Sequence, residues 1–324
     1  MFRSRFFKIF IAILAFSLLF YMVDLEELKS SLFKLTPENI FYLMMLSVLL
    51  LYLSALKWSY FLEAFSGPVS VLKLFNLYML GYFVNLIAPS YIGGDAARSY
   101  FIGKKVGQHQ AFAATILERY TGLVAMLSLG VVFVWIVDLV TWPIRIAVIV
   151  AALGLVVATI IALSEYSLTM LSKIKPLLPV IKHLKKIQDA LKLAKGNKTL
   201  LLKALIVSFT YHFFTVINVL IAAAVIGWND PSIVELFVVL PLIFLVSALP
   251  LTPNSLGLQE GAYYYFLTGI GATPTQALSI GIVLRAKTYV LAIWGGIVWL
   301  LMADKKGLSQ ASSELNASQN GQQP

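Results

Sequence analysis

Long apolar runs, separated by short polar gaps that are rich in Lys, dominate the pattern along the chain. A run of about 20 apolar residues crosses the hydrocarbon core of a bilayer as a helix, at about 1.5 Å per residue. The pattern therefore predicts an all-α, polytopic transmembrane helix bundle. The candidate membrane segments are 6–23, 40–62, 72–88, 111–137, 142–163, 200–226, 233–251, 255–271 and 277–302.

Two places in this pattern carry Pro and Gly residues that break a helix. One break, from Pro89 to Gly93, follows the segment 72–88, and the other, from Pro250 to Gly257, lies where the segments 233–251 and 255–271 meet. Non-helical backbone at membrane depth is tolerated only where protein or a watery cavity covers it. We therefore expect about six full spans plus two re-entrant or broken hairpins around a central cavity.

The Lys residues between 164 and 199 set the expected orientation, since Lys and Arg are enriched in cytoplasmic loops. They lie on the cytoplasmic side if the segment 72–88 returns to the side from which it entered. Both termini are then cytoplasmic, in the cell membrane. Residues 6–23 read as an uncleaved first helix, with a cleaved signal peptide as the alternative.

Two further segments have a distinct composition. Within 164–199, Val180, Leu184, Ile187 and Leu191 recur at helical spacing, which fits either an interfacial helix on anionic lipid or a solvated positive loop. The Ser-, Gln- and Asn-rich end predicts a disordered cytoplasmic tail over 303–324. The integral membrane domain is expected to span 1–302.

The composition excludes several function classes. The chain is 60% hydrophobic and 12% charged, whereas ordinary soluble domains are about one quarter charged. Most of the Lys and Arg residues behind the net charge of +10 sit in or near the gaps between apolar runs and not in a solvent-facing basic stripe, so nucleic-acid binding is not expected. The chain has no Cys and three His, which excludes thiol catalysis and argues against a metal site. We expect no cofactor and no metal.

Two stretches of the chain, 88–122 and 252–288, resemble each other and predict an internal repeat. Each has a Pro followed four residues later by Gly, then a carboxylate, a later Gly, and an Ala eight residues before an Arg. The matching positions are Pro89 and Pro253, Gly93 and Gly257, Asp95 and Glu260, Gly107 and Gly271, Ala111 and Ala277, and Arg119 and Arg285. With the orientation above, the copies are inverted, a plan that places a substrate site near the middle of the membrane.

Arg119 and Arg285 are the charges that most need an explanation. Each lies eight residues into its helix, about 12 Å from opposite surfaces, so the two are expected to converge. A charge at that depth costs from about 2.5 kcal/mol upward, and Arg does not lose its proton. Either the Arg residues pair with carboxylates in a fixed ion network, or they also bind an anionic ligand.

The expected substrate-binding residues are Asp95, Arg98, Glu118, Arg119, Glu260, Arg285 and Lys287. Backbone N–H groups at helix N-termini attract anions, so Gly93, Gly94 and Gly257 are expected to form a backbone anion site. Mid-helix His212 reads as a residue satisfied by a neighbouring polar group. Close helix packing is expected at Gly81, Gly122, Gly130, Gly295 and Gly296.

Three motifs carry a resemblance to a known family. They are Gly93-Gly94-Asp95-x-x-Arg98, the Glu118-Arg119 pair, and Pro253-x3-Gly257-x-x-Glu260-Gly261 with Arg285. Together they resemble the flippase domain of lysylphosphatidylglycerol synthases over about residues 5–302. Gln259 departs from the motif, where a second Gly often precedes the acidic residue.

The resemblance implies lipid translocation across the cytoplasmic membrane by a stand-alone member, without the aminoacyl-transferase domain of longer members. We expect translocation of an anionic or polyprenyl-linked lipid through a central charged cavity, and no enzymatic activity. The expected partner is a membrane lipid with a phosphate-bearing headgroup, alongside a homo-oligomer or a glycosyltransferase or lipid synthase. The alternatives are a non-catalytic partner of a separate glycosyltransferase and a membrane-embedded lipid-modifying enzyme.

Overall fold

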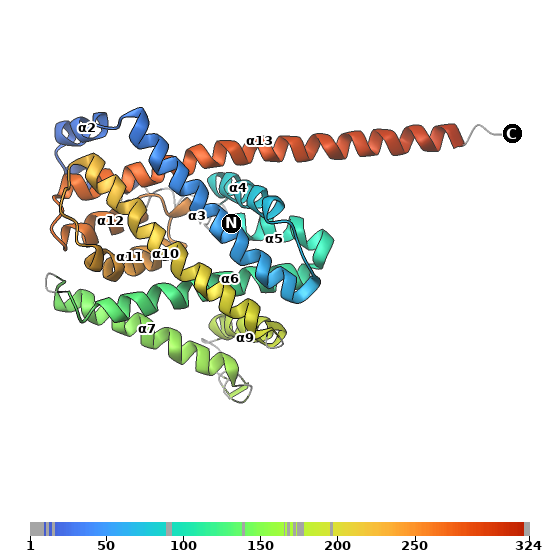
Figure 1. Ribbon diagram of the computed structural model, residues 1–324, viewed down its shortest axis with the longest axis horizontal. Helices are drawn as coiled ribbons and strands as arrows, with labels where there is room; N and C mark the ends of the chain where they lie inside the picture. The colour runs from blue at the N-terminus through green and yellow to red at the C-terminus, as the bar shows by residue number, and fades with distance from the viewer. Residues whose placement is uncertain are drawn as a thin grey trace.

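The computed structural model describes residues 10–320, except for 11–12, 15–16, 89–92, 138–139, 165, 167–168, 171–172, 174–177 and 195–196. The described part of the chain is an all-α bundle (Figure 1). Its α-helices are α2 (Leu25–Phe33), α3 (Pro37–Ser66), α4 (Val71–Ile87), α5 (Gly93–Val106), α6 (Gln108–Phe133), α7 (Trp142–Leu163), α9 (Leu178–Ala194), α10 (Lys198–Ile226), α11 (Ile233–Ser247), α12 (Leu258–Thr268) and α13 (Pro274–Asn320), with a 3₁₀ turn, η2 (Pro253–Ser255).

Five of the described helices are long and apolar enough to cross a membrane. They are α3, α6, α7, α10 and the Pro274–Leu301 part of α13. In a helix the backbone N–H and C=O groups hydrogen-bond to one another, which is necessary because lipid tails offer them no hydrogen-bond partners. The expected sixth span, 6–23, lies partly outside the described residues, and its residues 10, 13–14 and 17–21 are helical. The chain is therefore a multi-pass membrane protein.

Two pairs of shorter helices form the expected broken hairpins. The helix α4 ends at Ile87 before α5 begins, and α11 ends at Ser247 before α12 begins. Pro89 lies outside the described residues, whereas the second break contains η2. A Gly in the left-handed region joins each hairpin to a long helix, with φ of 96° at Gly107 before α6 and 102° at Gly271 before α13.

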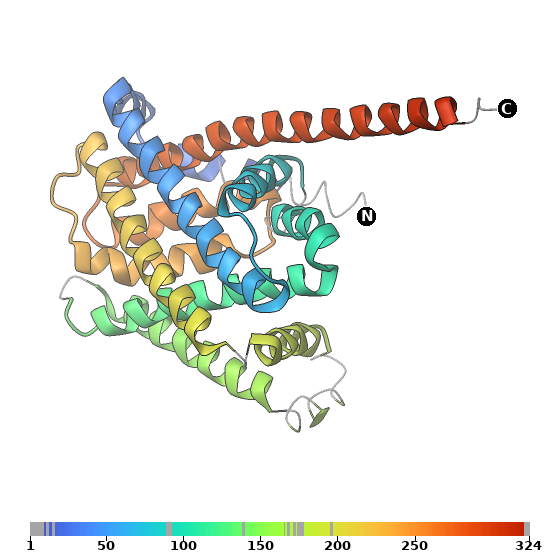
Figure 2. The same cartoon turned by 45° about the vertical axis from the view of Figure 1, so that its right-hand side comes forward.

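The two hairpins enter the bundle from opposite ends. In Figure 1 the hairpin of α4 and α5 lies to the right and that of α11 and α12 to the left, and α6 and α13 run in opposite directions. Figure 2 shows the same arrangement. The helix α4 contacts η2, so the hairpins meet inside the bundle. This is the inverted repeat that the sequence predicts.

Glycines bring the helices of the first hairpin into close contact. A Cβ on Gly94 would lie 2.3 Å from the Gly81 carbonyl oxygen, so α4 and α5 touch backbone to backbone. A Cβ on Gly295 would lie 1.9 Å from the carbonyl oxygen of Met79, which fastens α13 to α4. Gly296 packs on Phe83 of the same helix. The predicted close packing at these glycines is confirmed.

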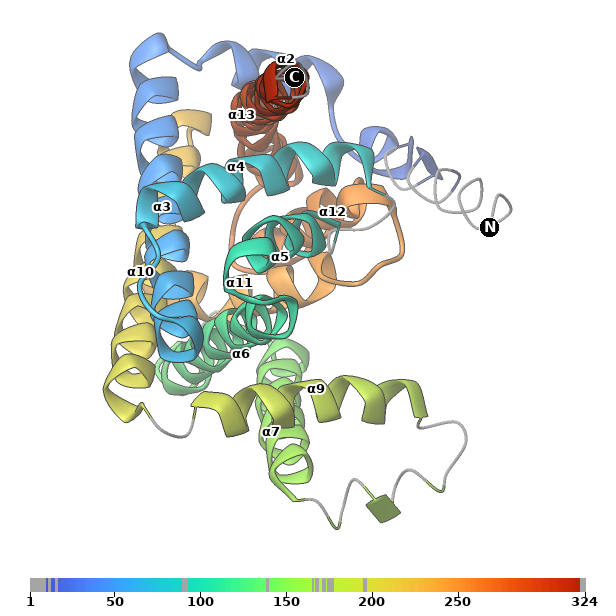
Figure 3. The same ribbon diagram turned by 90° about the vertical axis from the view of Figure 1, so that its right-hand side faces the viewer.

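The helix α9 lies across α7 at one end of the bundle (Figure 3). Its residues Ile181 and Leu184 are buried with Ala162 of α7. The lysines Lys185 and Lys186 are exposed. The predicted amphipathic helix therefore exists and packs its apolar face on protein, and binding of its lysines to anionic lipid stays a prediction.

The last helix continues well past Leu301. It is helical to Asn320 and points away from the bundle (Figure 1), where the composition predicts a disordered tail over 303–324. The disordered cytoplasmic tail over 303–324 stays a prediction. The boundary of the membrane domain at residue 302 stays a prediction.

The contact between α13 and α4 makes Gly295 intolerant of a side chain. We predict that Gly295→Ala lowers the free energy of unfolding by about 1–3 kcal/mol, because the new Cβ would overlap backbone that cannot move aside. The measurement is thermal unfolding in detergent. Gly154→Ala on α7 is the matched control, since nothing lies within 4 Å of its Cβ position. Equal melting temperatures for the two variants would contradict the prediction.

Candidate functional site

A cluster of five charged side chains lies where α3, α5 and α6 meet. Its members are Lys57 of α3, Asp95 and Arg98 of α5, and Glu118 and Arg119 of α6. Asp95 and Arg98 stand one helical turn apart on α5 and therefore share a face. We call this group the first-repeat cluster.

Arg98 is the most buried member, with 1% of the residue exposed. Its Nη2 donates to Glu118 Oε2 over 2.6 Å, and its Nε donates to Asp95 Oδ1 over 3.0 Å. The guanidinium carbon also lies 4.4 Å from the centre of the Trp58 ring and 4.1 Å from that of Tyr78. Cation–π contacts of this kind stabilise a cation that has lost its water. Its Nη1 is buried without a hydrogen-bond partner.

Glu118 is shared between two cations. Besides Arg98, it pairs with Lys57, whose Nζ lies 3.4 Å from Glu118 Oε1. Both Lys57 and Glu118 are buried. A carboxylate at this depth needs such partners, because removing a charge from water costs several kcal/mol.

Arg119 is the accessible member of the cluster. Its Nε and Nη2 bind the two oxygens of Asp95 over 2.9 and 2.8 Å, which is a bidentate pair. The Arg119 side chain is nevertheless 47% exposed, and that of Asp95 17%. Among the residues that the structure describes, three cations and two carboxylates give the first-repeat cluster a formal charge of +1.

The second repeat forms a neutral pair between Glu260 of α12 and Arg285 of α13. Arg285 Nε donates to Glu260 Oε1 over 2.6 Å. The Arg285 Nη1 and Nη2 donate to the carbonyl oxygens of Asn254 and Ser255 over 2.7 and 3.0 Å. These two turn residues have φ of 47° and 55°, a region that non-glycine residues rarely adopt. The pair is buried and holds the broken segment in this conformation.

The structure therefore gives each predicted Arg a carboxylate from its own repeat. Arg119 binds Asp95 and Arg285 binds Glu260, and the convergence of the two guanidinium groups on one site stays a prediction. The cause is local, since each hairpin places its carboxylate in the first turn of its second short helix. Lys287 lies apart from these pairs and donates to Asn218 Oδ1 of α10.

Two of the predicted backbone donors already have acceptors. The Gly94 N–H donates to Asn85 Oδ1 over 2.7 Å, and the Gly257 N–H donates to Glu260 Oε2 over 2.8 Å. At Gly93, a Cβ would lie 2.3 Å from the Cβ of Ala88, so a larger residue would clash there. An anion would reach the Gly94 or Gly257 donor only by displacing a side chain, and a backbone anion site stays a prediction.

Sequence reasoning missed four residues at this site. Lys57 was not among the expected site residues, although α3 continues to Ser66 and buries its amine. The signal was present, because a Lys inside an apolar run demands a partner. Trp58, Tyr78 and Asn85 gave no such signal, since aromatic and amide residues are common in membrane helices.

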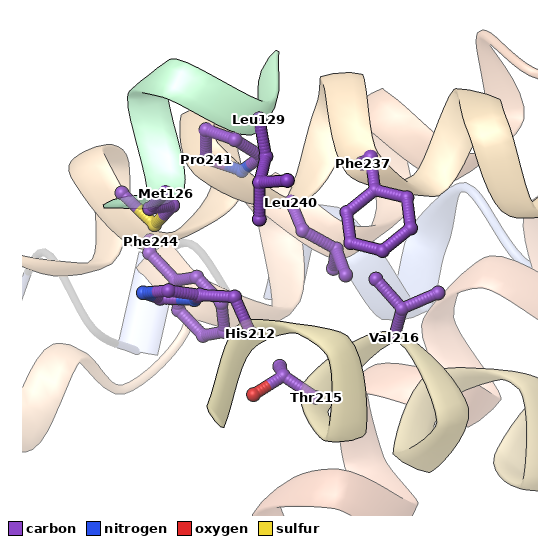
Figure 4. Close-up of a pocket in the computed structure, with 9 residues that line it drawn as sticks. All are labelled: Met126, Leu129, His212, Thr215, Val216, Phe237, Leu240, Pro241 and Phe244. Atoms are coloured by element: carbon purple, nitrogen blue, oxygen red, sulfur yellow. The ribbon is translucent and has the colours of Figure 1, made fainter. Parts of the chain in front are cut away.

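His212 lies beside an apolar pocket between α6, α10 and α11 (Figure 4). Its Nε2 is 2.9 Å from the Gly122 carbonyl oxygen, so the prediction that a neighbouring group satisfies this His is confirmed. The pocket is lined by Met126, Leu129, His212, Thr215, Val216, Phe237, Leu240, Pro241 and Phe244. Its cavity volume of about 10 Å³ is far below the range of about 300–1,000 Å³ typical of small-molecule sites.

Comparison with known proteins places these features in a family. The model of the lysylphosphatidylglycerol synthase TM region matches residues 5–295. The chain belongs to this family. Both repeats and all of the paired charges fall inside the matched residues.

Two relatives are known by name as UPF0104 membrane proteins. That of Methanothermobacter thermautotrophicus is 25% identical over 304 residues, which cover 86% of this chain and 89% of the relative. That of Methanocaldococcus jannaschii is 18% identical over 304 residues, covering 88% and 90%. No solved structure matches the chain significantly.

The Glu260–Arg285 pair generates a stability prediction. Arg285→Gln leaves Glu260 buried without its cation and frees the carbonyls of the left-handed turn, so we expect a loss of about 3–5 kcal/mol in unfolding free energy. Thermal unfolding in detergent measures the loss. Lys104→Gln, at an exposed position, is the control. Equal melting temperatures for Arg285→Gln and Lys104→Gln would contradict a structural role for the pair.

Proposed function

We propose that this protein translocates a phosphate-bearing lipid, anionic or polyprenyl-linked, across the cell membrane. The observation that carries the proposal is the first-repeat cluster, which holds a net positive charge and the half-exposed Arg119. An ion network built only for stability would tend toward neutrality, as the second-repeat pair does. A surplus cation within the membrane calls for an anion.

A lipid phosphodiester fits the chemistry of this cluster. It carries one negative charge, which equals the surplus of the cluster. Its oxygens match the planar fork of a guanidinium, and Arg119 presents that fork with Nε and Nη2. A headgroup is the part of a lipid that needs such compensation inside the bilayer.

The inverted hairpins support movement of the headgroup between leaflets. Membrane transporters commonly place discontinuous helices around a central site and open it alternately to each side. The hairpins of this chain enter from opposite ends and meet where α4 contacts η2. The Lys-rich gaps favour cytoplasmic termini, so the first hairpin would open toward the cytoplasm.

A headgroup-accessibility assay tests the proposal. The full chain is reconstituted in liposomes with phosphatidylglycerol labelled on an acyl chain with nitrobenzoxadiazole (NBD), and the inner-leaflet label is followed with a membrane-impermeant reductant, with and without a pH gradient. We expect the protein to accelerate exchange. Arg119→Ala should slow it at least about tenfold, equivalent to about 1.4 kcal/mol of barrier.

Labelled phosphatidylcholine, whose headgroup has no net charge, controls for unspecific scrambling. Lys104→Gln, at the exposed end of α5, controls for a general loss of positive charge. Exchange by Arg119→Ala at the rate of the unmodified protein would remove the basis of the proposal.

A further inference from the structure

Asp95 holds Arg119 in the geometry that a phosphate would use. Both carboxylate oxygens accept from Arg119, one from Nε over 2.9 Å and one from Nη2 over 2.8 Å. Two oxygens of a phosphodiester bind the same two donors in the same planar fork. The accessible guanidinium is thus already occupied by an anion of the protein.

Asp95 has a second ion-pair partner besides Arg119. Its Oδ1 also accepts from Arg98 Nε over 3.0 Å, and Arg98 belongs to the same helix one turn away. A carboxylate that released Arg119 would therefore keep one ion pair.

From this arrangement we infer that Asp95 is an internal competitor for the ligand. It occupies Arg119 when the site is empty, and the phosphate of the incoming lipid replaces it there while Asp95 stays on Arg98. The inference rests on the proposed function and adds a mechanism for release, because the returning carboxylate expels the phosphate. The competition is electrostatic, and no covalent bond forms or breaks.

The second repeat has the same residue types without this property. Glu260 binds Arg285, but the remaining donors of that guanidinium are fixed on the carbonyls of Asn254 and Ser255, and the residue is 6% exposed. The Gly257 N–H donates to Glu260, so replacing Glu260 by a ligand on Arg285 would also leave this N–H without its acceptor. The two repeats therefore divide the work, with ligand exchange in the first and a structural lock in the second.

The inference predicts a change opposite in sign to the loss of an ordinary binding residue. Asp95→Asn removes the competing charge, so we expect tighter binding of the anionic lipid, by about tenfold if the free site is populated about one tenth of the time. Lipid exchange in liposomes should become slower, because release becomes slower. Loss of an ordinary binding residue, or a damaged fold, would weaken both binding and exchange.

Binding of acyl-labelled NBD-phosphatidylglycerol to the purified full chain in detergent is the measurement, with labelled phosphatidylcholine as the zwitterionic probe, whose phosphodiester charge is offset by choline. Asp230→Asn is the matched control, since it makes the same change of carboxylate to amide at an exposed position outside both repeats and should give no gain. Asp95→Glu keeps the competing charge and should also give none. Displacement of the probe by millimolar inorganic phosphate supports the same exchange with free phosphate as a ligand, and its absence supports the lipid headgroup.

Melting temperatures of all variants establish that they are folded, and Asp95→Ser replaces Asp95→Asn if the latter does not purify. Suppose that the unmodified protein binds and exchanges the lipid, but the uncharged Asp95 variant binds it equally well or more weakly. This result would overturn the inference about Asp95 and leave the proposed function standing. Absence of binding and exchange in the unmodified protein would instead overturn the proposed function.

Discussion

Permanent charge inside an apolar slab is the constraint on which this structure depends. Arg98 cannot be neutralised by losing its proton, and it is almost fully removed from solvent. Its stability there requires Glu118 and Asp95 on one side and the faces of Trp58 and Tyr78 on the other. Helices α3, α4, α5 and α6 all contribute to this coordination. The ion network is thus also what joins the first hairpin to the spanning helices.

The same constraint is met differently in the two repeats. In the second repeat, one Arg and one Glu cancel, and backbone carbonyls complete the guanidinium, so the site is closed. In the first repeat, Lys57 adds a third cation from outside the repeated sequence. A chain with internal symmetry has therefore acquired an asymmetric centre through a residue that the repeat does not contain.

Much of this arrangement could be predicted from sequence because membrane burial makes few solutions available. The spans, the two breaks and the pairing of Arg119 and Arg285 with carboxylates follow from backbone satisfaction and charge compensation, which act on single residues. The close contacts of Gly81 and Gly295 follow likewise from residue size. The choice of ion-pair partner does not follow from these single-residue constraints. The sequence fails to show that Asp95 binds both Arg98 and Arg119, since pairing depends on which faces of three helices meet.

The sequence likewise gives no signal for how exposed each Arg side chain is. Arg119 and Arg285 occupy equivalent places in the repeat, yet one is half exposed and the other is buried. The difference arises from what packs beside each helix, and that involves residues far apart in the chain. The pairing of Lys57 with Glu118 was missed for the same reason.

The glycine contacts of the first hairpin limit how the bundle can move. Gly81 and Gly94 bring the backbones of α4 and α5 into contact, and Gly295 does the same for α13 and α4. At these contacts no side chains separate the helices. Sliding of one past another would force backbone atoms to collide. Any opening of the protein must therefore carry α4, α5 and α13 as a single rigid body, with its hinges outside this trio, at joints such as the left-handed Gly107.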